Sequence, residues 1–108
     1  MLVDTRASAE YMRTNGWTTH QYRNDAGKVC LFGAVIHSHA PMQRIGPMSE
    51  AAEDKMRDLR AVVSSHLNAE LRRYTNGEFN DIFGWNDEVA DEAEVLRFLE
   101  SIEPFEIT

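Results

Sequence analysis

Two side chains that can act together in nucleophilic catalysis or metal binding lie seven residues apart, Cys30 and His37. If their segment is helical, this spacing is close to two turns, so the thiol and the imidazole share one face. The pair could then serve as nucleophile and base, or as two metal ligands. An activated cysteine needs exposed, electropositive surroundings, whereas Cys30 belongs to the most hydrophobic run of the chain, residues 29–36. We therefore expect a small core side chain at Cys30, with a reactive thiol as the alternative.

The histidines lack the spacing of a metal site. His37 and His39 would point about 200° apart on a helix, so they cannot easily bind one ion together. The chain has no Cys-x-x-Cys, His-Glu-x-x-His or calcium-loop pattern, and its glycines are scattered rather than gathered in a phosphate loop. We therefore expect no metal and no cofactor. His66, on the apolar side of a predicted helix, is expected to be a hydrogen-bonded core residue, and His20 has no assigned role.

The string Trp85-Asn86-Asp87 is the most unusual local motif. In a structural role, the indole fills the core while Asn86 and Asp87 fix a tight loop through side-chain hydrogen bonds. In a functional role, these three side chains lie at a partner or ligand surface. We favour the structural role and keep Asn86 and Asp87, together with Cys30 and His37, as candidate ligand-binding residues.

The negative charge is concentrated in the last third of the chain. Residues 1–77 carry 10 basic and 8 acidic side chains, whereas residues 78–108 carry only Arg97 against 10 acids, a net charge of −9. A surface of one sign can attract a basic partner, although it can also simply keep a domain soluble. General nucleic-acid binding is not expected, because its affinity comes from lysine and arginine. The candidate partner-binding residues are Glu88, Asp91, Glu92 and Glu94, with Trp85 as an aromatic anchor.

Apolar spacing and capping residues predict a mainly α fold, a compact four-helix domain with a short β-strand or hairpin near residues 17–30. The helices are expected from Asp4 or Thr5 to about residue 14, from about Cys30 to His39, from Ser49 to about residue 75, and from Asp91 to about residue 103. Helix and strand both remain open for residues 29–36, because a short apolar run fits either. Residues 41–47 and 78–87 are expected to be loops, the second one ordered.

Length and composition indicate one domain, residues 1–108. The chain is long enough for one hydrophobic core, and 43% of its residues are apolar against 27% charged, as in ordinary globular proteins. It has no apolar run long enough to span a membrane and no apolar signal-peptide core at its start, so we expect a cytoplasmic protein without membrane contact. The single cysteine excludes an internal disulfide.

Three motifs give the chain a resemblance to a family of small proteins. They are Asn15-Gly16-Trp17 after a helix, the string Cys30-Leu31-Phe32-Gly33-Ala34-Val35, and Trp85-Asn86-Asp87 followed by a short amphipathic helix. With these motifs the chain resembles an uncharacterised family of actinobacterial and actinophage proteins, from about Tyr11 to Leu99. Val29 stands where that family often has a tryptophan. The resemblance implies a compact helical fold and an actinobacterial or phage source, and it carries no activity.

Two functional hypotheses follow. The first is a non-enzymatic protein-interaction domain, for example a phage accessory protein that binds or modulates a host protein through its acidic C-terminal surface. The alternative is a small-molecule-binding or metal-binding domain, or a minor enzyme, centred on Cys30, His37 and the Trp85-Asn86-Asp87 loop. A homo-oligomer that buries Phe79, Ile82 and Phe83 between subunits is also open.

Overall fold

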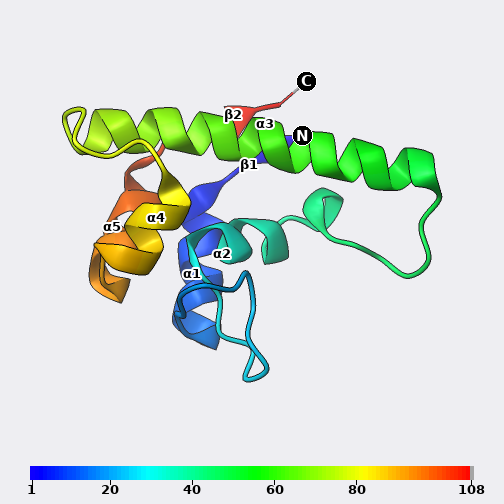
Figure 1. The fold of residues 1–108 in the computed structure, drawn as a ribbon, viewed down its shortest axis with the longest axis horizontal. Helices are drawn as coiled ribbons and strands as arrows, with labels where there is room; N and C mark the ends of the chain where they lie inside the picture. Colours follow the sequence, from blue (N-terminus) through cyan, green and yellow to red (C-terminus); the bar gives the residue numbers. More distant parts are fainter. Residues whose placement is uncertain (108) are drawn as a thin grey trace.

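A computed structural model describes residues 1–107 and contains five α-helices, one 3-10 helix and one two-stranded sheet in that part of the chain (Figure 1). The longest helix, α3, runs along one side of the molecule. The other four α-helices lie together beneath its C-terminal half, and the segment with the 3-10 helix lies beneath its N-terminal half. The elements are β1 (Leu2–Val3), α1 (Thr5–Asn15), α2 (Leu31–His37), η1 (Ala40–Met42), α3 (Glu50–Tyr74), α4 (Ile82–Glu88), α5 (Glu92–Ser101) and β2 (Phe105–Glu106).

Side chains cap the start of each α-helix. The carboxylates of Asp4, Asp81 and Asp91 accept hydrogen bonds from backbone N–H groups in the first turns of α1, α4 and α5. The Ser49 hydroxyl does the same for α3, accepting from Ala52 N at 3.2 Å. Each such cap stabilises a helix by about 1 kcal/mol. The predicted starts of the first, third and last helices are therefore confirmed.

The expected loop at residues 78–87 is wrong from Ile82 onward, because these residues form α4. Ile82, Trp85 and Asn86 recur at the spacing of one helix face, and all three are buried. Gly84 lies inside this helix, close to the Asp81 side chain that caps it. A Cβ there would lie 3.1 Å from the capping oxygen Asp81 Oδ2. The helix total is therefore five rather than four.

The expected hairpin near residues 17–30 is replaced by two isolated bridges, in which Val29 pairs with Trp17 and with Arg23. His20 interrupts the extended segment, since its φ of +66° lies in the left-handed region that no strand adopts. The sheet forms instead between the two ends of the described chain, with Leu2 opposite Glu106 and Val3 opposite Phe105. The mainly α fold is confirmed.

The core is built around α2. The hydrophobic run is helical from Leu31 onward, as predicted, and Cys30 is the N-cap of this helix rather than its first residue. Residues 31–36 are all buried and pack against α1 and α4. Gly33 is required here because any Cβ at this position would overlap the backbone carbonyl of Tyr22. The loop before α2 thus lies directly on the helix. No helix among residues 1–107 has both the length and the apolar character needed to cross a membrane.

Candidate functional site

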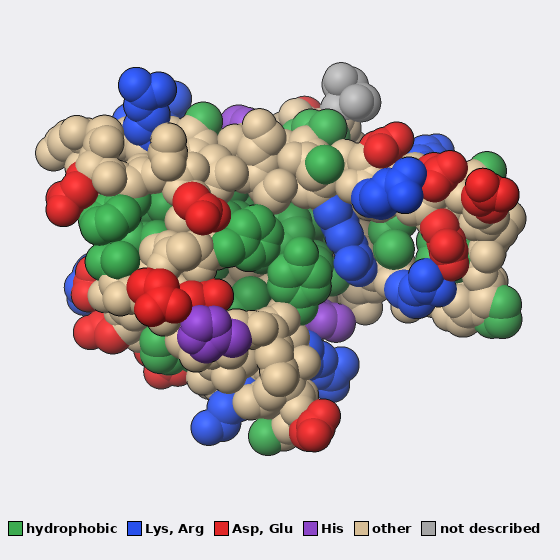
Figure 2. Space-filling view, viewed as in Figure 1, with side chains coloured by type: hydrophobic (Ala, Val, Ile, Leu, Met, Phe, Trp, Pro, Cys, Tyr) green, Lys and Arg blue, Asp and Glu red, His purple; other side chains and the backbone are tan. Residues whose placement is uncertain are grey.

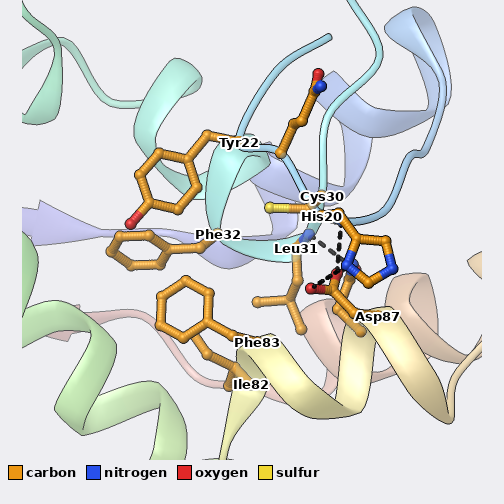
Figure 3. Close-up of a pocket in the computed structure, with 10 residues that line it drawn as sticks. His20, Tyr22, Cys30, Leu31, Phe32, Ile82, Phe83 and Asp87 are labelled. Carbon is orange, nitrogen blue, oxygen red and sulfur yellow. Dashed lines mark hydrogen bonds and ion pairs between the residues drawn. The ribbon is translucent and has the colours of Figure 1, made fainter.

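A pocket of about 310 Å³ opens between the start of α2, the buried side of α4 and residues 20–22 (Figure 3). One wall is apolar and aromatic, and the opposite rim is polar. Because α2 ends at His37 and α4 begins only at Ile82, the tertiary fold alone creates this pocket. Its lining consists of His20, Gln21, Tyr22, Cys30, Leu31, Phe32, Ile82, Phe83, Asn86 and Asp87.

Asn86 joins the three segments that form the pocket. Its Oδ1 accepts hydrogen bonds from Trp17 Nε1 at 2.8 Å and from the backbone N–H of Leu31 at 3.0 Å. Its Nδ2 donates to the Thr18 carbonyl at 3.3 Å and to Asp87 Oδ1 at 2.9 Å. The side chain is 1% exposed, and both its amide donors and its oxygen are occupied. Asn86 therefore holds the site together and has no free group for a ligand.

Asp87 forms the polar rim together with its neighbours. Its Oδ1 accepts the backbone N–H of His20 at 2.9 Å, which fixes the left-handed turn of that loop. The His20 imidazole lies 3.5 Å from Asp87 Oδ2 and 3.9 Å from Glu88 Oε1. The Glu88 side chain is 71% exposed, so this end of the pocket presents carboxylate to solvent.

Cys30 lines the pocket but is a poor nucleophile. Burial raises the pKa of its thiol, and the negative charge of Asp87 raises it further, although backbone N–H groups of Gly33 and Phe32 act in the opposite direction. The sulfur accepts a hydrogen bond from Gly33 N at 3.3 Å as the helix cap. In Figure 3 it points toward the aromatic wall, while the His20 ring lies on the Asp87 side. The geometry thus pairs Cys30 with the helix backbone rather than with a base.

His37 does not join this site. Seven residues of helix separate it from Cys30 by about 10 Å along the axis, so a shared face does not place the two side chains in one pocket. Its ring stacks on Tyr11 with 6.2 Å between ring centroids. Burial lowers the pKa of His37, and the nearby Arg23 and Arg60 lower it further. The structure therefore separates His37 from the other three candidate ligand-binding residues, which do meet.

Trp85 also leaves the surface. It is 4% exposed and packs edge-on against Phe98, with ring centroids 5.5 Å apart. The expectation of an exposed aromatic anchor is therefore wrong for Trp85, because the helical spacing of α4 turns its indole inward. This burial agrees with the structural role favoured for it.

The predicted acidic residues remain at the surface to different degrees. Glu88, Asp91 and Glu92 are exposed, whereas Glu94 is half-buried. Asp91 accepts the Glu94 N–H as the cap of α5, so its carboxylate is partly committed to the fold. Of this acidic set only Glu88 comes near the pocket. It does not line the pocket, but its Oε1 lies 3.9 Å from Nε2 of the lining residue His20.

The aromatic wall was not predicted. Tyr22, Phe32 and Phe83 pack on one another, with ring centroids 5.5 to 6.1 Å apart. Phe32 is buried, but Tyr22 is 46% exposed and Phe83 is partly exposed. The three rings are as far as 61 residues apart in the sequence, so no local pattern points to them. The only hint in the sequence is the aromatic content of residues 17–22, which includes Tyr22.

A second pocket, of about 480 Å³, lies on the other side of the same three rings. Its remaining wall comes from α3 and the segment before it, and it carries three arginines against one glutamate. Arg60 is held in place by a hydrogen bond from its Nε to the Met42 carbonyl at 2.8 Å. The charged residues of this second pocket are Arg44, Glu53, Arg57 and Arg60.

Two other predictions on histidines and metals can be compared with the structure. His66 is not a core residue, since its side chain is 39% exposed and stacks on Phe105 with 3.7 Å between ring centroids. His66 therefore lies on the side of α3 that packs against β2. Within residues 1–107 no three His, Cys, Asp or Glu side chains gather closely enough to hold a metal ion.

The fold and the site thus define a small, mainly helical protein with a partly aromatic pocket between α2 and α4. The chain belongs to a family of unknown function, DUF6197, whose model matches residues 4–103. No curated protein and no solved structure matches it. The family match covers almost the whole chain and, like the resemblance in the sequence motifs, transfers no activity.

Proposed function

We propose that this chain is a non-enzymatic protein-interaction domain that binds a partner segment carrying a basic side chain next to a large apolar one. The observation that carries this proposal is the pocket between α2 and α4. Its aromatic wall is open to solvent at Tyr22 and Phe83, and its rim carries the carboxylate of Asp87, with that of Glu88 beside it across His20. An apolar side chain in the pocket would be desolvated while a neighbouring lysine or arginine pairs with the rim.

The pocket is better suited to binding than to catalysis. A thiol with a raised pKa is largely protonated near neutral pH, and the thiolate is the nucleophilic form. The side chain of Asn86 is fully used in hydrogen bonds that hold the loop to the helices. The rim residues Asp87 and Glu88 are therefore the charged groups available to a ligand, and carboxylates select cations.

The rim is also pre-organised, which reduces the entropy lost on binding. Asp87 is fixed by hydrogen bonds from His20 N and Asn86 Nδ2, both at 2.9 Å. Glu88 ends α4 beside it. This arrangement favours the acidic surface predicted from the sequence, but with Tyr22 and Phe83 as its aromatic part in place of Trp85.

A selection from a random peptide library tests the proposal directly. The folded chain is expected to enrich peptides with lysine or arginine beside leucine, phenylalanine or tryptophan. Their affinity should fall at least about tenfold in Glu88→Arg and in Tyr22→Ala, and should weaken with salt. Glu78→Arg is the matched control, because Glu78 is exposed but neither lines the pocket nor, unlike Glu88, pairs with His20 at its rim. If no peptide is enriched, or if Glu88→Arg binds as well as the unmodified chain, the proposal is wrong.

A small-molecule ligand is the second candidate function. The pocket volume falls at the lower end of the range for ligand sites, and its walls are mostly apolar with a few polar groups. A cationic aromatic fragment would fit the same chemistry as the proposed peptide. Fragment screening by NMR would favour this candidate if shifts centre on Leu31 and Phe83 while no peptide binds.

The resemblance in the motifs adds a biological context to the proposal. An actinobacterial or actinophage source would make a host protein with a basic segment the natural partner class, and the chain would then act as a phage accessory protein in the host cytoplasm. Peptides enriched in the selection can be compared with basic segments of such host proteins, and the whole host protein then tested for binding.

A further inference from the structure

The two pockets that flank the aromatic cluster carry opposite charge. Tyr22, Phe32 and Phe83 form a wall common to both pockets. On the α4 side the rim is acidic, with Asp87 in the lining and Glu88 beside it. On the α3 side the lining has three arginines against one glutamate, although Arg44 pairs with Glu53 and the exposed Arg57 pairs with Asp54 of its own helix. One face of the molecule therefore runs from an acidic rim through the aromatic rings to a region with an excess of arginine.

Figure 2 shows this arrangement on the broad face of the molecule. A hydrophobic area occupies the centre of the face, and acidic side chains border it near α4. Basic side chains, interspersed with acidic ones, lie beneath and along the N-terminal half of α3. Tyr22 at 46% exposure supplies apolar surface that nothing else in residues 1–107 covers. The order of charge along the face is the feature that a partner must match.

We propose that this face binds a second copy of the same chain in a two-fold symmetric dimer. The inference rests on the proposed function, because it uses the same acidic rim, and it names the partner. A two-fold rotation about the aromatic centre places the acidic rim of one copy against the basic pocket of the other, and the reverse contact forms at the same time. Glu88 of each copy would then face the partner's Arg57, with Tyr22 and Phe83 near the axis.

The size of the face agrees with this partner. The molecule measures 39 × 31 Å across its two longer axes, and the broad face presents both. A standard stable interface buries about 800 Å² on each partner, which fits within such a face. Aromatic side chains at the centre and charged side chains at the rim are also the usual composition of protein interfaces.

Charge-swap variants test the symmetric contact, with the molar mass measured by light scattering and sedimentation. In a dimer of Glu88→Arg, two arginine–arginine contacts replace the two ion pairs. In a dimer of Arg57→Glu, two glutamate–glutamate contacts replace them. Each variant should weaken the dimer by about 100-fold, because each repulsive contact occurs twice and costs about a factor of ten. A one-to-one mixture of the two variants should restore the dimer, since every swapped residue then meets an opposite charge.

Matched controls separate this contact from a general effect of charge. Lys55→Glu lies on α3 two residues from Arg57, but Lys55 lines a pocket on another face with Val62 and Ile107. Glu78→Arg changes the charge by the same amount as Glu88→Arg, but Glu78 neither lines a flanking pocket nor pairs with the pocket residue His20. Both controls should dimerise like the unmodified chain, and circular dichroism should show that all four variants are folded.

A dimer in the unmodified chain, lost in each single swap and regained in the mixture, supports the proposal. A monomer at about 1 mM protein, near the weak end of measurable association, overturns it. Dimers that persist in both single swaps, or a mixture that stays monomeric, overturn it as well, since another surface would then be responsible. Peptide binding measured on the same samples keeps the two proposals distinguishable, because a monomer that still binds basic peptides through Glu88 refutes only the dimer.

Discussion

Replacing Asn86 with alanine removes the side chain that connects the loop of residues 17–22 to α2 and α4. The substitution deletes the acceptor for Trp17 Nε1 and for the Leu31 N–H. The Leu31 amide is the first N–H of α2, which has no partner within its own helix. It is buried, so water cannot replace the lost oxygen without opening the structure.

The expected loss follows from these contacts. Asn86 takes part in four hydrogen bonds, each with a net contribution of about 1 kcal/mol, and a buried unsatisfied N–H adds a desolvation penalty of about 1–3 kcal/mol. Allowing for relaxation of the exposed loop, we expect Asn86→Ala to lower the free energy of unfolding by about 3 kcal/mol. A domain of this size has about 5–15 kcal/mol in total, so the variant still folds. Its Tm should fall by roughly 12 °C or more.

Urea denaturation followed by circular dichroism measures the loss, and hydrogen exchange locates it. Asn80→Ala is the matched control, since Asn80 is exposed and its side chain forms no hydrogen bond within residues 1–107; its free energy of unfolding should change by less than about 0.5 kcal/mol. In Asn86→Ala the Leu31 amide should lose protection while the amides in the middle of α3 keep theirs. A change in unfolding free energy below about 1 kcal/mol, or an unaltered Leu31 amide, would refute the assigned role of Asn86.

Three further predictions use other parts of the site. Gly33→Ala should destabilise the fold by about 1–3 kcal/mol or more, because the new Cβ overlaps the Tyr22 carbonyl. Gly84→Ala should have a milder effect, because its Cβ meets only the adaptable Asp81 side chain. Urea denaturation compares the two variants, and equal effects would contradict the close contact at Gly33. Cys30 should react with a thiol reagent more slowly than a cysteine peptide at pH 8 and accelerate only at higher pH, because burial raises its pKa; a rate equal to that of the peptide would contradict this. NMR titration of His37 should give a pKa below the ordinary value for histidine. The unfolded chain then binds more protons than the folded chain, so the stability falls as the pH drops below about 6.5. A normal or raised pKa would contradict the assigned effect of burial and of Arg23 and Arg60.

The parts of the fold that could be predicted are those set by neighbouring residues. Asp4, Ser49 and Asp91 stand immediately before helices and bond to N–H groups within three residues, so the local pattern was sufficient. The apolar stripe of α3 contains its buried residues Val63, Leu67 and Leu71 at four-residue spacing. The α4 helix could not be predicted from such local patterns, because it is only seven residues long and contains glycine and asparagine, which are common in turns.

The site could be predicted only in part, because its contacts join distant segments. Asn86 bonds to Leu31 across 55 residues and to Trp17 across 69 residues. The sequence did indicate Cys30, Asn86 and Asp87 as candidate residues, but nothing local places Tyr22 against Phe83. The β-branched and aromatic residues of 17–22 also suggested a strand, whereas side-chain bonds to α4 fix this loop in its irregular path. Tertiary contacts thus overrode the local β propensity.

The three sequence motifs that suggested the family meet where the loop of residues 17–22 packs against α2 and α4, the joint between these segments. Trp17 donates to Asn86, Cys30 caps α2, and Gly33 admits the Tyr22 backbone. Each of these groups helps to hold the loop, α2 and α4 together, so the fold alone accounts for these motif residues. Of the side chains that would select a partner, Asp87 belongs to a motif, whereas Tyr22, Phe83, Glu88 and Arg57 lie outside the motifs. A chain with the same joint but different residues at these four positions would keep the pocket and bind something else, and exchanging the four residues between two such chains should therefore exchange their partners.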